Sequence, residues 1–220
     1  MTGATGRPAA GGGRWVAVSP ARLERWLDGF EERHGALRCD ADARRVSFTA
    51  QDGTRAECAV PFAPLTVDAA SRNGGLIAHA CRDRVVGVLL VRLGGHAVGV
   101  FDGPRLAASK VGSRPVHGRS AAGGWSQQRF ARRRENQVKV AIDAAAGVAA
   151  GILLPEAQRL DAVVAGGDRR AVDAVLADER LMPLRGLLRG ELLDVPDPNR
   201  RVLDASYEQF TAVRIRVIDG

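Results

Sequence analysis

Cysteine, lysine and long apolar stretches are scarce in this sequence of 220 residues, and each shortage narrows the possible functions. The three cysteines, Cys39, Cys58 and Cys81, are widely spaced and odd in number, so we expect neither a zinc site nor a disulfide framework. The longest apolar run, residues 141–154, contains Asp143 and is too short to cross a bilayer, and the N-terminus lacks a signal-peptide pattern. The sequence therefore predicts a cytoplasmic protein with no membrane partner, no metal and no cofactor.

Lys110 and Lys139 are the only lysines among the 32 basic residues. Arginine binds phosphate and stacks on bases better than lysine, although a GC-rich coding genome would produce the same bias. The net charge is +7, and the segment from Gly103 to Val140 holds nine basic residues against one acid, Glu135, so this segment carries +8 and the rest of the chain about −1. We expect a nucleic acid to bind this segment. The alternative is a basic face that is merely solvated.

The composition and residue patterns in the first third of the chain predict a tail followed by a small α+β subdomain. Residues 1–13 are rich in glycine and alanine and indicate a disordered tail. Residues 14–66 form the predicted subdomain, which contains a hairpin at 46–60. It also contains an amphipathic helix at 20–34, whose apolar side chains recur three and four residues apart at Leu23, Trp26, Leu27 and Phe30.

The alternation of strand and helix patterns along residues 67–220 predicts an α/β domain with a mixed sheet and flanking helices. Gly166-Gly167 is interpreted as an ordinary turn between a strand and a helix capped by Asp168, since it lacks the spacing of a phosphate-binding loop. The long helix is expected to end near Gly151. The predicted strands are 85–93, 97–101, 105–116, 160–165 and 210–218, and the predicted helices are 126–150 and 168–177.

A glycine-rich segment from His117 to Gln128 lies between the third predicted strand and the long basic helix. Its pair Gly123-Gly124 lets the backbone bend sharply and approach a ligand closely. Glutamine is neutral, so Gln127 and Gln128 are neither general bases nor nucleophiles near pH 7, but an amide can orient water and stabilise developing charge. The segment predicts a reaction in which another molecule, such as a hydroxyl group within an RNA assembly, supplies the acid–base chemistry.

Three parts of this region carry a resemblance to a known family. The region resembles the catalytic loop of archaeal and eukaryotic class I release factors, in which HGRGGQ is followed by a helix of RFARLR type. The similar segments are His117-Gly118-Arg119, Gly123-Gly124 and Arg129-Phe130-Ala131-Arg132. The more specific resemblance is to release-factor-like peptidyl-tRNA hydrolases of ribosome quality control, of the actinobacterial VLRF type, which have GGSQ-like loops. Gly124-Trp125-Ser126-Gln127 fits that pattern with one extra residue. The resemblance covers residues 115–135 strongly and 67–220 loosely.

The resemblance implies a ribonuclease-H-like release-factor catalytic domain that hydrolyses peptidyl-tRNA on stalled ribosomes or large subunits. Gln127 would act as the catalytic glutamine with Gln128 as its competitor, and Gly123 and Gly124 would complete the catalytic set. The expected partners are the peptidyl-transferase centre of the large subunit, the CCA end of peptidyl-tRNA and ribosomal RNA. The chain looks too short for a codon-reading domain, and we expect a monomer off the ribosome. The expected RNA-binding residues are His117, Arg119, Trp125, Ser126, Arg129, Arg132, Arg133, Arg134 and Lys139.

Several alternatives stay open at this point. Trp125 either stacks on a base or packs the loop onto the domain, and His117 either contacts the loop or RNA or is an ordinary surface histidine. A metal-dependent nuclease would need carboxylates gathered around magnesium, for which Asp102, Asp143 and Asp161 are the candidates. A ribosome-binding factor without catalytic activity would use the arginine-rich helix alone.

Overall fold

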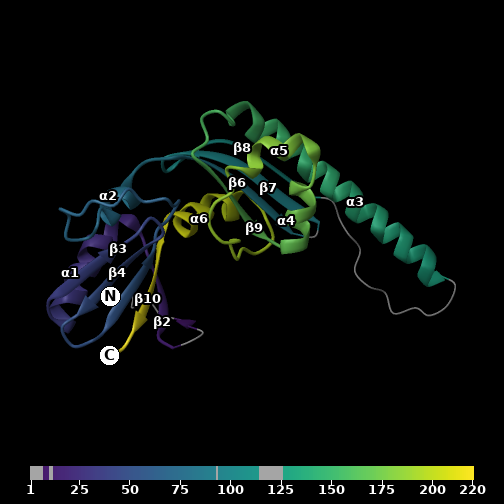
Figure 1. The fold of residues 1–220 in the computed structure, drawn as a ribbon. Coiled ribbons are helices and arrows are strands. Elements are labelled where there is room, and N and C mark those ends of the chain that lie inside the picture. The colour runs from purple at the N-terminus through teal and green to yellow at the C-terminus, as the bar shows by residue number, and fades with distance from the viewer. Residues whose placement is uncertain (1–6, 10–11, 93, 114–125) are drawn as a thin grey trace. The chain divides into compact units, whose positions relative to one another are not determined.

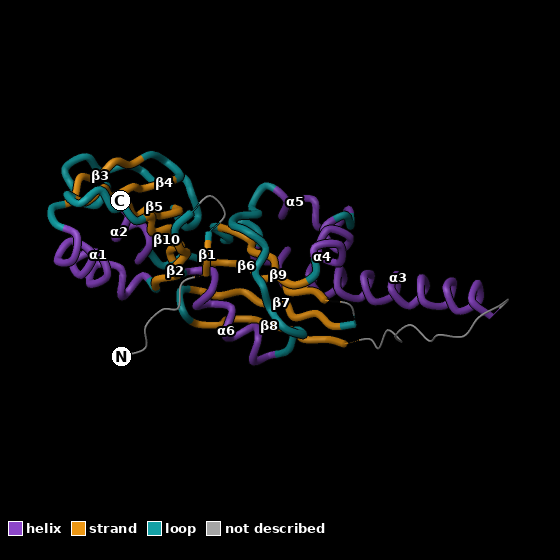
Figure 2. The backbone as a smooth tube through the Cα atoms, turned by 90° about the horizontal axis from the view of Figure 1, so that it is seen from below, coloured by secondary structure: helices purple, strands orange, loops and turns teal. Residues whose placement is uncertain are grey.

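The computed structural model describes residues 7–9, 12–92, 94–113 and 126–220, with the backbone alone at 126–131 (Figures 1 and 2). The chain divides into two compact units. Unit 1 comprises Met1–Arg82 and Glu208–Gly220, and unit 2 comprises Asp83–Tyr207. This division differs from the predicted boundary at residue 66, because the end of the chain returns to the first unit.

Unit 1 is a six-stranded antiparallel sheet with two helices. The strand order is β1-β2-β10-β5-β4-β3, and the predicted hairpin 46–60 is confirmed as β4 and β5. Strand β1 lies within the predicted disordered tail and pairs with β2, so that part of the tail prediction was wrong. The elements are β1 (Arg7–Pro8), β2 (Arg14–Val18), α1 (Pro20–His34), β3 (Leu37–Ala41), β4 (Arg45–Ala50), β5 (Arg55–Ala59), α2 (Leu76–Cys81) and β10 (Val213–Ile218).

The core of unit 1 lies between the helices and one face of this sheet. The predicted helix 20–34 is confirmed, and its residues Leu23, Leu27 and Phe30 are buried as the spacing predicted. Strand β10 was predicted as the last strand of the second domain, but it pairs with β2 and β5 in the middle of the first sheet. It contributes three buried side chains to the core, Val213, Ile215 and Val217.

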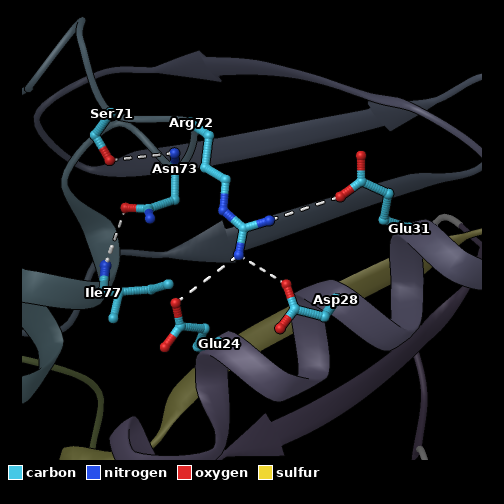
Figure 3. A network of polar contacts seen from close by, with 7 residues as sticks. All are labelled: Glu24, Asp28, Glu31, Ser71, Arg72, Asn73 and Ile77. Carbon is cyan, nitrogen blue, oxygen red and sulfur yellow. Dashed lines mark hydrogen bonds and ion pairs between the residues drawn. The ribbon is translucent and has the colours of Figure 1, made fainter.

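Arg72 ties the segment before α2 to the exposed side of α1 (Figure 3). Its guanidinium group lies 2.7 Å from a carboxylate oxygen of Asp28, 3.7 Å from Glu31 and 3.9 Å from Glu24. The hydrogen bond and the charge of Asp28, followed by the charges of Glu31 and Glu24, raise the pKa of Arg72. Exposed ion pairs of this kind each stabilise a protein by only about 0–1 kcal/mol, so the network positions the segment more than it stabilises the unit.

Unit 2 is built on a four-stranded mixed sheet, which confirms the predicted α/β class with flanking helices. The order is β8-β7-β6-β9, with β6 and β9 parallel and the other pairs antiparallel. The strands are β6 (Val85–Arg92), β7 (Gly95–Asp102), β8 (Arg105–Ser113) and β9 (Ala162–Gly167). The helices are α3 (Ser126–Leu153), η1 (Leu154–Glu156), α4 (Arg169–Leu176), η2 (Glu179–Leu181) and α5 (Met182–Arg185), and a further helix, α6 (Arg200–Thr211), begins in unit 2 and ends in unit 1.

Helices cover both faces of the unit 2 sheet. Ala145, Ala149 and Leu153 of α3 are buried in a core formed with Leu89 and Val91 of β6. On the other face α6 packs against β7, where the rings of Phe101 and Tyr207 lie 5.5 Å apart. A strand covered on both faces is apolar along its whole length, and residues 86–91 of β6 are all buried.

Two predicted boundaries in unit 2 were wrong. Gly166-Gly167 ends strand β9 rather than forming a turn beyond it. Gly167 has φ +103°, and a Cβ atom there would collide with the carbonyl oxygen of Val91, so glycine is required by both conformation and space. Helix α3 continues through Gly151 to Leu153, because Leu153 is buried in the core. The predicted cap is confirmed, since Asp168 accepts a hydrogen bond of 2.9 Å from the amide of Ala171.

One described helical stretch, Arg132–Glu156, is long and apolar enough to cross a membrane by length and composition. The expectation from the apolar run 141–154 missed it, because the helix extends beyond that run at both ends. Buried helices of globular domains share these properties of length and composition. In this stretch, 22% of the most apolar window is buried within the protein. Since Ala145, Ala149 and Leu153 of this stretch belong to the core of unit 2, we do not assign it to a membrane.

Candidate functional site

The N-terminal half of α3 extends beyond the sheet that its C-terminal half covers (Figure 1). The helix has 28 residues, which corresponds to about 42 Å at the usual rise per residue. Its buried side chains begin at Ala145, whereas every described side chain from 132 to 144 is exposed or half-buried. The free half of this helix therefore offers its surface to a partner.

Basic side chains follow this free half in a regular arrangement. Arg132, Arg133 and Lys139 are exposed, and Arg134 is half-buried on the side that continues into the core stripe. Arg132 and Lys139 are seven residues apart and so point within about 20° of each other around the helix. None of these four cations forms an ion pair with a carboxylate among the described residues. Their charge is therefore available to an external anion, and the RNA-binding role of these residues stays a prediction.

The two candidate glutamines lie at the free end of the same helix. Ser126, Gln127 and Gln128 form the backbone of its first turn, and Arg129 follows. The amides of a first helical turn have no partner within the helix and carry a partial positive charge, so they suit a developing oxyanion. Gly123 and Gly124, together with the predicted RNA contacts His117, Arg119 and Trp125, lie outside the described residues.

A cavity of about 300 Å³ lies under the middle of α3, where the helix leaves the sheet. Val138, Ala141 and Ile142 of α3 form one wall, and His96 of β7 and Asp168 of the α4 cap lie opposite. The cavity was not predicted, because the residues that line it come from segments far apart in the sequence. Its lining is mostly apolar, which marks incomplete packing of α3 at this point.

Two of the three carboxylates proposed for the nuclease alternative serve separate structural roles. Asp102 lies 3.5 Å from Arg159 and 3.6 Å from Arg105, and Asp161 accepts a hydrogen bond of 2.8 Å from the amide of Val85. Within the described part of the chain, no three His, Cys, Asp or Glu side chains come close enough together to hold a metal ion. The arrangement that a magnesium-dependent nuclease needs is not formed by these described residues.

Two of the described histidines form hydrogen bonds within the protein, and the three cysteines differ in burial. His34 bonds with Asp52 at 2.8 Å, and a ring nitrogen of His79 lies 2.8 Å from the carbonyl oxygen of Pro61. Cys58 is fully buried, and burial raises the pKa of its thiol. Cys39 is half-buried and Cys81 is exposed, so Cys58 is the one of the three that belongs to the buried core.

The solved structures that match this chain include two archaeal chains of low sequence identity. One, described as an archaeal protein, is 16% identical with a TM-score of 0.41, and the match covers 74% of this chain and 52% of that chain. The other, the crystal structure of the archaeal translation termination factor aRF1, is 14% identical with a TM-score of 0.42, covering 90% and 66%. This chain thus spans about half the length of the first relative and 66% of the second.

A comparison with curated proteins found no match. The family model described as the Actinobacteria/chloroflexi VLRF1 release factor matches residues 84–216, which is more than half of the chain. The matched region includes the basic helix α3 and the glycine-rich segment before it. The chain therefore belongs to the Actinobacteria/chloroflexi VLRF1 release factor family.

Proposed function

We propose that this protein hydrolyses the ester bond of peptidyl-tRNA on the ribosome and releases the nascent peptide without reading a codon. One observation carries the proposal: Gln127 and Gln128 occupy the first turn at the free end of α3, and exposed cations follow within two turns. Membership of a release factor family supports it independently. The protein would act in the cytoplasm, on stalled ribosomes or separated large subunits, as a monomer when it is off the ribosome.

Arg132, Arg133 and Lys139 would hold the helix against ribosomal RNA and the CCA end of the tRNA. These cations are exposed and have no ion-pair partner among the described carboxylates, so binding phosphate would not require an internal ion pair to break. Each phosphate contact releases a counterion, and we expect the logarithm of affinity to fall with the logarithm of salt concentration by roughly 0.7–0.9 per contact.

The reaction would begin when a water molecule attacks the carbonyl carbon of the ester that joins the peptide to the terminal adenosine. A new carbon–oxygen bond forms, the bond to the ribose oxygen breaks, and the ribose oxygen receives a proton through the tRNA hydroxyl and ribosomal RNA. The amide of Gln127, from its side chain or its backbone, would position the water or donate to the oxyanion. Glutamine remains neutral throughout, which is why the RNA must carry the proton.

The test is incubation of the purified protein with ribosome-bound peptidyl-tRNA, with free peptide as the measured product. Gln127→Ala removes the side-chain amide and keeps the backbone amide, so it should slow release by about 10²–10³-fold where the side chain is the oxyanion donor. Co-sedimentation with ribosomes should remain close to wild type, because this substitution removes no charge. If Gln128→Ala abolishes release while Gln127→Ala does not, the catalytic assignment moves to Gln128.

Two further outcomes would overturn the proposal. Full release by a variant in which both glutamines are alanine would indicate a ribosome-binding factor without this chemistry. Cleavage of the RNA itself in the presence of magnesium would indicate a nuclease.

Charge reversal at Arg132 and Arg133 should weaken ribosome binding, whereas the same change at Arg169 and Arg170, exposed in the first turn of α4, is the matched control.

A further inference from the structure

The sheet of unit 1 has two faces of different character, and the strand register shows which residues share each face. Residues directly opposite one another on neighbouring strands point to the same side. One such row crosses five strands and consists of Trp15, Arg216, Glu57, Ser47 and Asp40. The residues between them along each strand, such as Ile215 and Cys58, point to the opposite side and belong to the core with α1 and α2.

Two shorter rows complete the face that the core does not use, which we name the open face. Arg55, Thr49 and Arg38 form a row across three neighbouring strands, which the half-buried Ile218 of β10 extends to a fourth. Arg214 lies beside Ala17, and Arg45 beside Ala59. None of the described side chains in these rows is buried, and the apolar residues of α1 and α2 pack with the other face.

The open face is strongly basic for its size. It carries five arginines and two carboxylates, a net charge of +3. On the helical side of the unit, Arg72 is surrounded by Glu24, Asp28 and Glu31, a group with a net charge of −2 (Figure 3). The five arginines of the open face are Arg38, Arg45, Arg55, Arg214 and Arg216.

An aromatic ring stands among these arginines. The guanidinium carbon of Arg214 lies 4.9 Å from the centre of the Trp15 ring, within the range of a cation–π contact. Arg216 donates hydrogen bonds of 3.0 and 3.1 Å to the carbonyl oxygen of Gly12 and lies 3.9 Å from Glu57. Arg38 and Arg55 are exposed and form no ion pair with a described carboxylate. The face thus combines one ordered aromatic–arginine stack with guanidinium groups available to an anion.

We propose that the open face of unit 1 binds single-stranded RNA. An extended RNA strand presents phosphates to arginine and flat bases to aromatic rings and guanidinium planes, and a sheet face carrying both is a common platform for such strands. The row Arg55–Thr49–Arg38 spans about 10 Å across three strands and adds a hydroxyl group between two cations. Most of this site lies before position 84, outside the residues that the release factor family model matches, and only Arg214 and Arg216 of its five arginines lie within them.

The open face and helix α3 are therefore two separate RNA-binding surfaces, in different units of the chain. The charge distribution within unit 1 favours RNA on the open face and disfavours it near Arg72. An acidic protein would be drawn to the same charge. The hydroxyl groups of Ser47 and Thr49 and the Trp15–Arg214 stack favour RNA, because bases offer both hydrogen-bonding edges and ring faces.

The test measures binding of the full chain to a short fluorescent oligouridine as salt is varied. Arg38→Glu with Arg55→Glu should weaken binding by about tenfold or more and reduce the salt slope by roughly 1.4, for two lost phosphate contacts on a single strand. Arg22→Glu with Arg25→Glu, two exposed arginines of α1, is the matched control and should change the affinity less than twofold by the same reasoning. Equal effects of the two double variants would overturn the proposal.

A second measurement does not depend on charge reversal. With Trp26 and Trp125 replaced by phenylalanine, Trp15 is the only tryptophan, and oligouridine should quench its fluorescence as a base stacks on it. Absence of quenching at saturating RNA would overturn the proposal. Poly-glutamate that binds as tightly as oligouridine and quenches Trp15 equally would assign the open face to an acidic protein instead.

Discussion

Strands β6 and β10 illustrate the contrast between the two sheets. Residues 86–91 of β6 are all buried, because helices cover both faces of the unit 2 sheet. Strand β10 alternates, with Val213, Ile215 and Val217 buried while Arg214 is exposed and Arg216 half-buried. A continuously apolar strand has no face left for a ligand, whereas an alternating strand keeps one face for the core and another for recognition. The contrast places structural constraint in the unit 2 sheet, whereas the unit 1 sheet keeps an exposed face, the one that we propose for RNA.

The largest effect that tests this contrast should come from Leu89→Ala in β6. Leu89 has no exposed surface, and a leucine replaced by alanine in a core costs about 2–5 kcal/mol of the free energy of unfolding. Arg55→Ala on the open face should change this free energy by less than about 0.5 kcal/mol. Denaturant unfolding, with hydrogen exchange of the amides in β6 and β10, measures each sheet separately. Similar costs for the two changes would contradict the contrast.

Gly167→Ala should have the next largest effect. The substitution places a side chain at φ +103° and against the carbonyl oxygen of Val91, which costs about 1–3 kcal/mol in strain. The control is Gly186→Ala, where φ is −68° and no atom lies within 4 Å of the added methyl group, so little or no loss of stability is expected. Hydrogen exchange at the β6–β9 pairing is the measurement. Equal protection in both variants would show that the end of β9 tolerates adjustment.

Asp168→Ala should cost about 1 kcal/mol, the usual value for the loss of a helix cap. The substitution removes the acceptor of the 2.9 Å hydrogen bond from Ala171 and leaves the buried residues of α4, Val172 and Val175, unchanged. Asp168→Asn retains an acceptor and should recover most of the loss. If alanine and asparagine behave alike in thermal unfolding, the cap does not stabilise α4.

The smallest effect should come from Arg72→Gln in unit 1. The Arg72 side chain is 58% exposed, so the loss of its three ion pairs should cost no more than about 1 kcal/mol. The expected change is local: faster hydrogen exchange in α2 and the segment before it, with the β10 amides unaffected. High salt should produce the same local change in the wild-type protein, and salt-independent exchange in α2 would argue against an electrostatic tie.

Local patterns predicted most of the individual elements. The three- and four-residue spacing of Leu23, Leu27 and Phe30 gave α1, and the same spacing in α3 separated the buried Ala145 and Ala149 from the exposed Arg132 and Lys139. Such patterns report which side of a helix faces a core. They placed the α3 cations outside the buried stripe, while the RNA-binding role of those cations and the catalytic assignments of Gln127 and Gln128 stay predictions.

Pairing between distant segments was not predictable from these patterns. The alternation at Arg214 and Arg216 identified a strand but not its neighbours β2 and β5, so the open face could not be assembled from the sequence. Helix α6 was missed, and Phe210 was assigned to the strand that follows it. Helix α2 has only six residues, too few for a periodic pattern to emerge.

The position of β10 also determines when unit 1 can be completed. This strand follows unit 2 in the chain, yet it lies between β2 and β5 in the first sheet. During synthesis, the amides and carbonyls along β2 and β5 must wait until all of unit 2 has been made before they find their partner. A chain interrupted after unit 2 would expose these two strand edges, which are prone to pair with other chains. A factor proposed to rescue interrupted synthesis would thus itself be vulnerable to interruption.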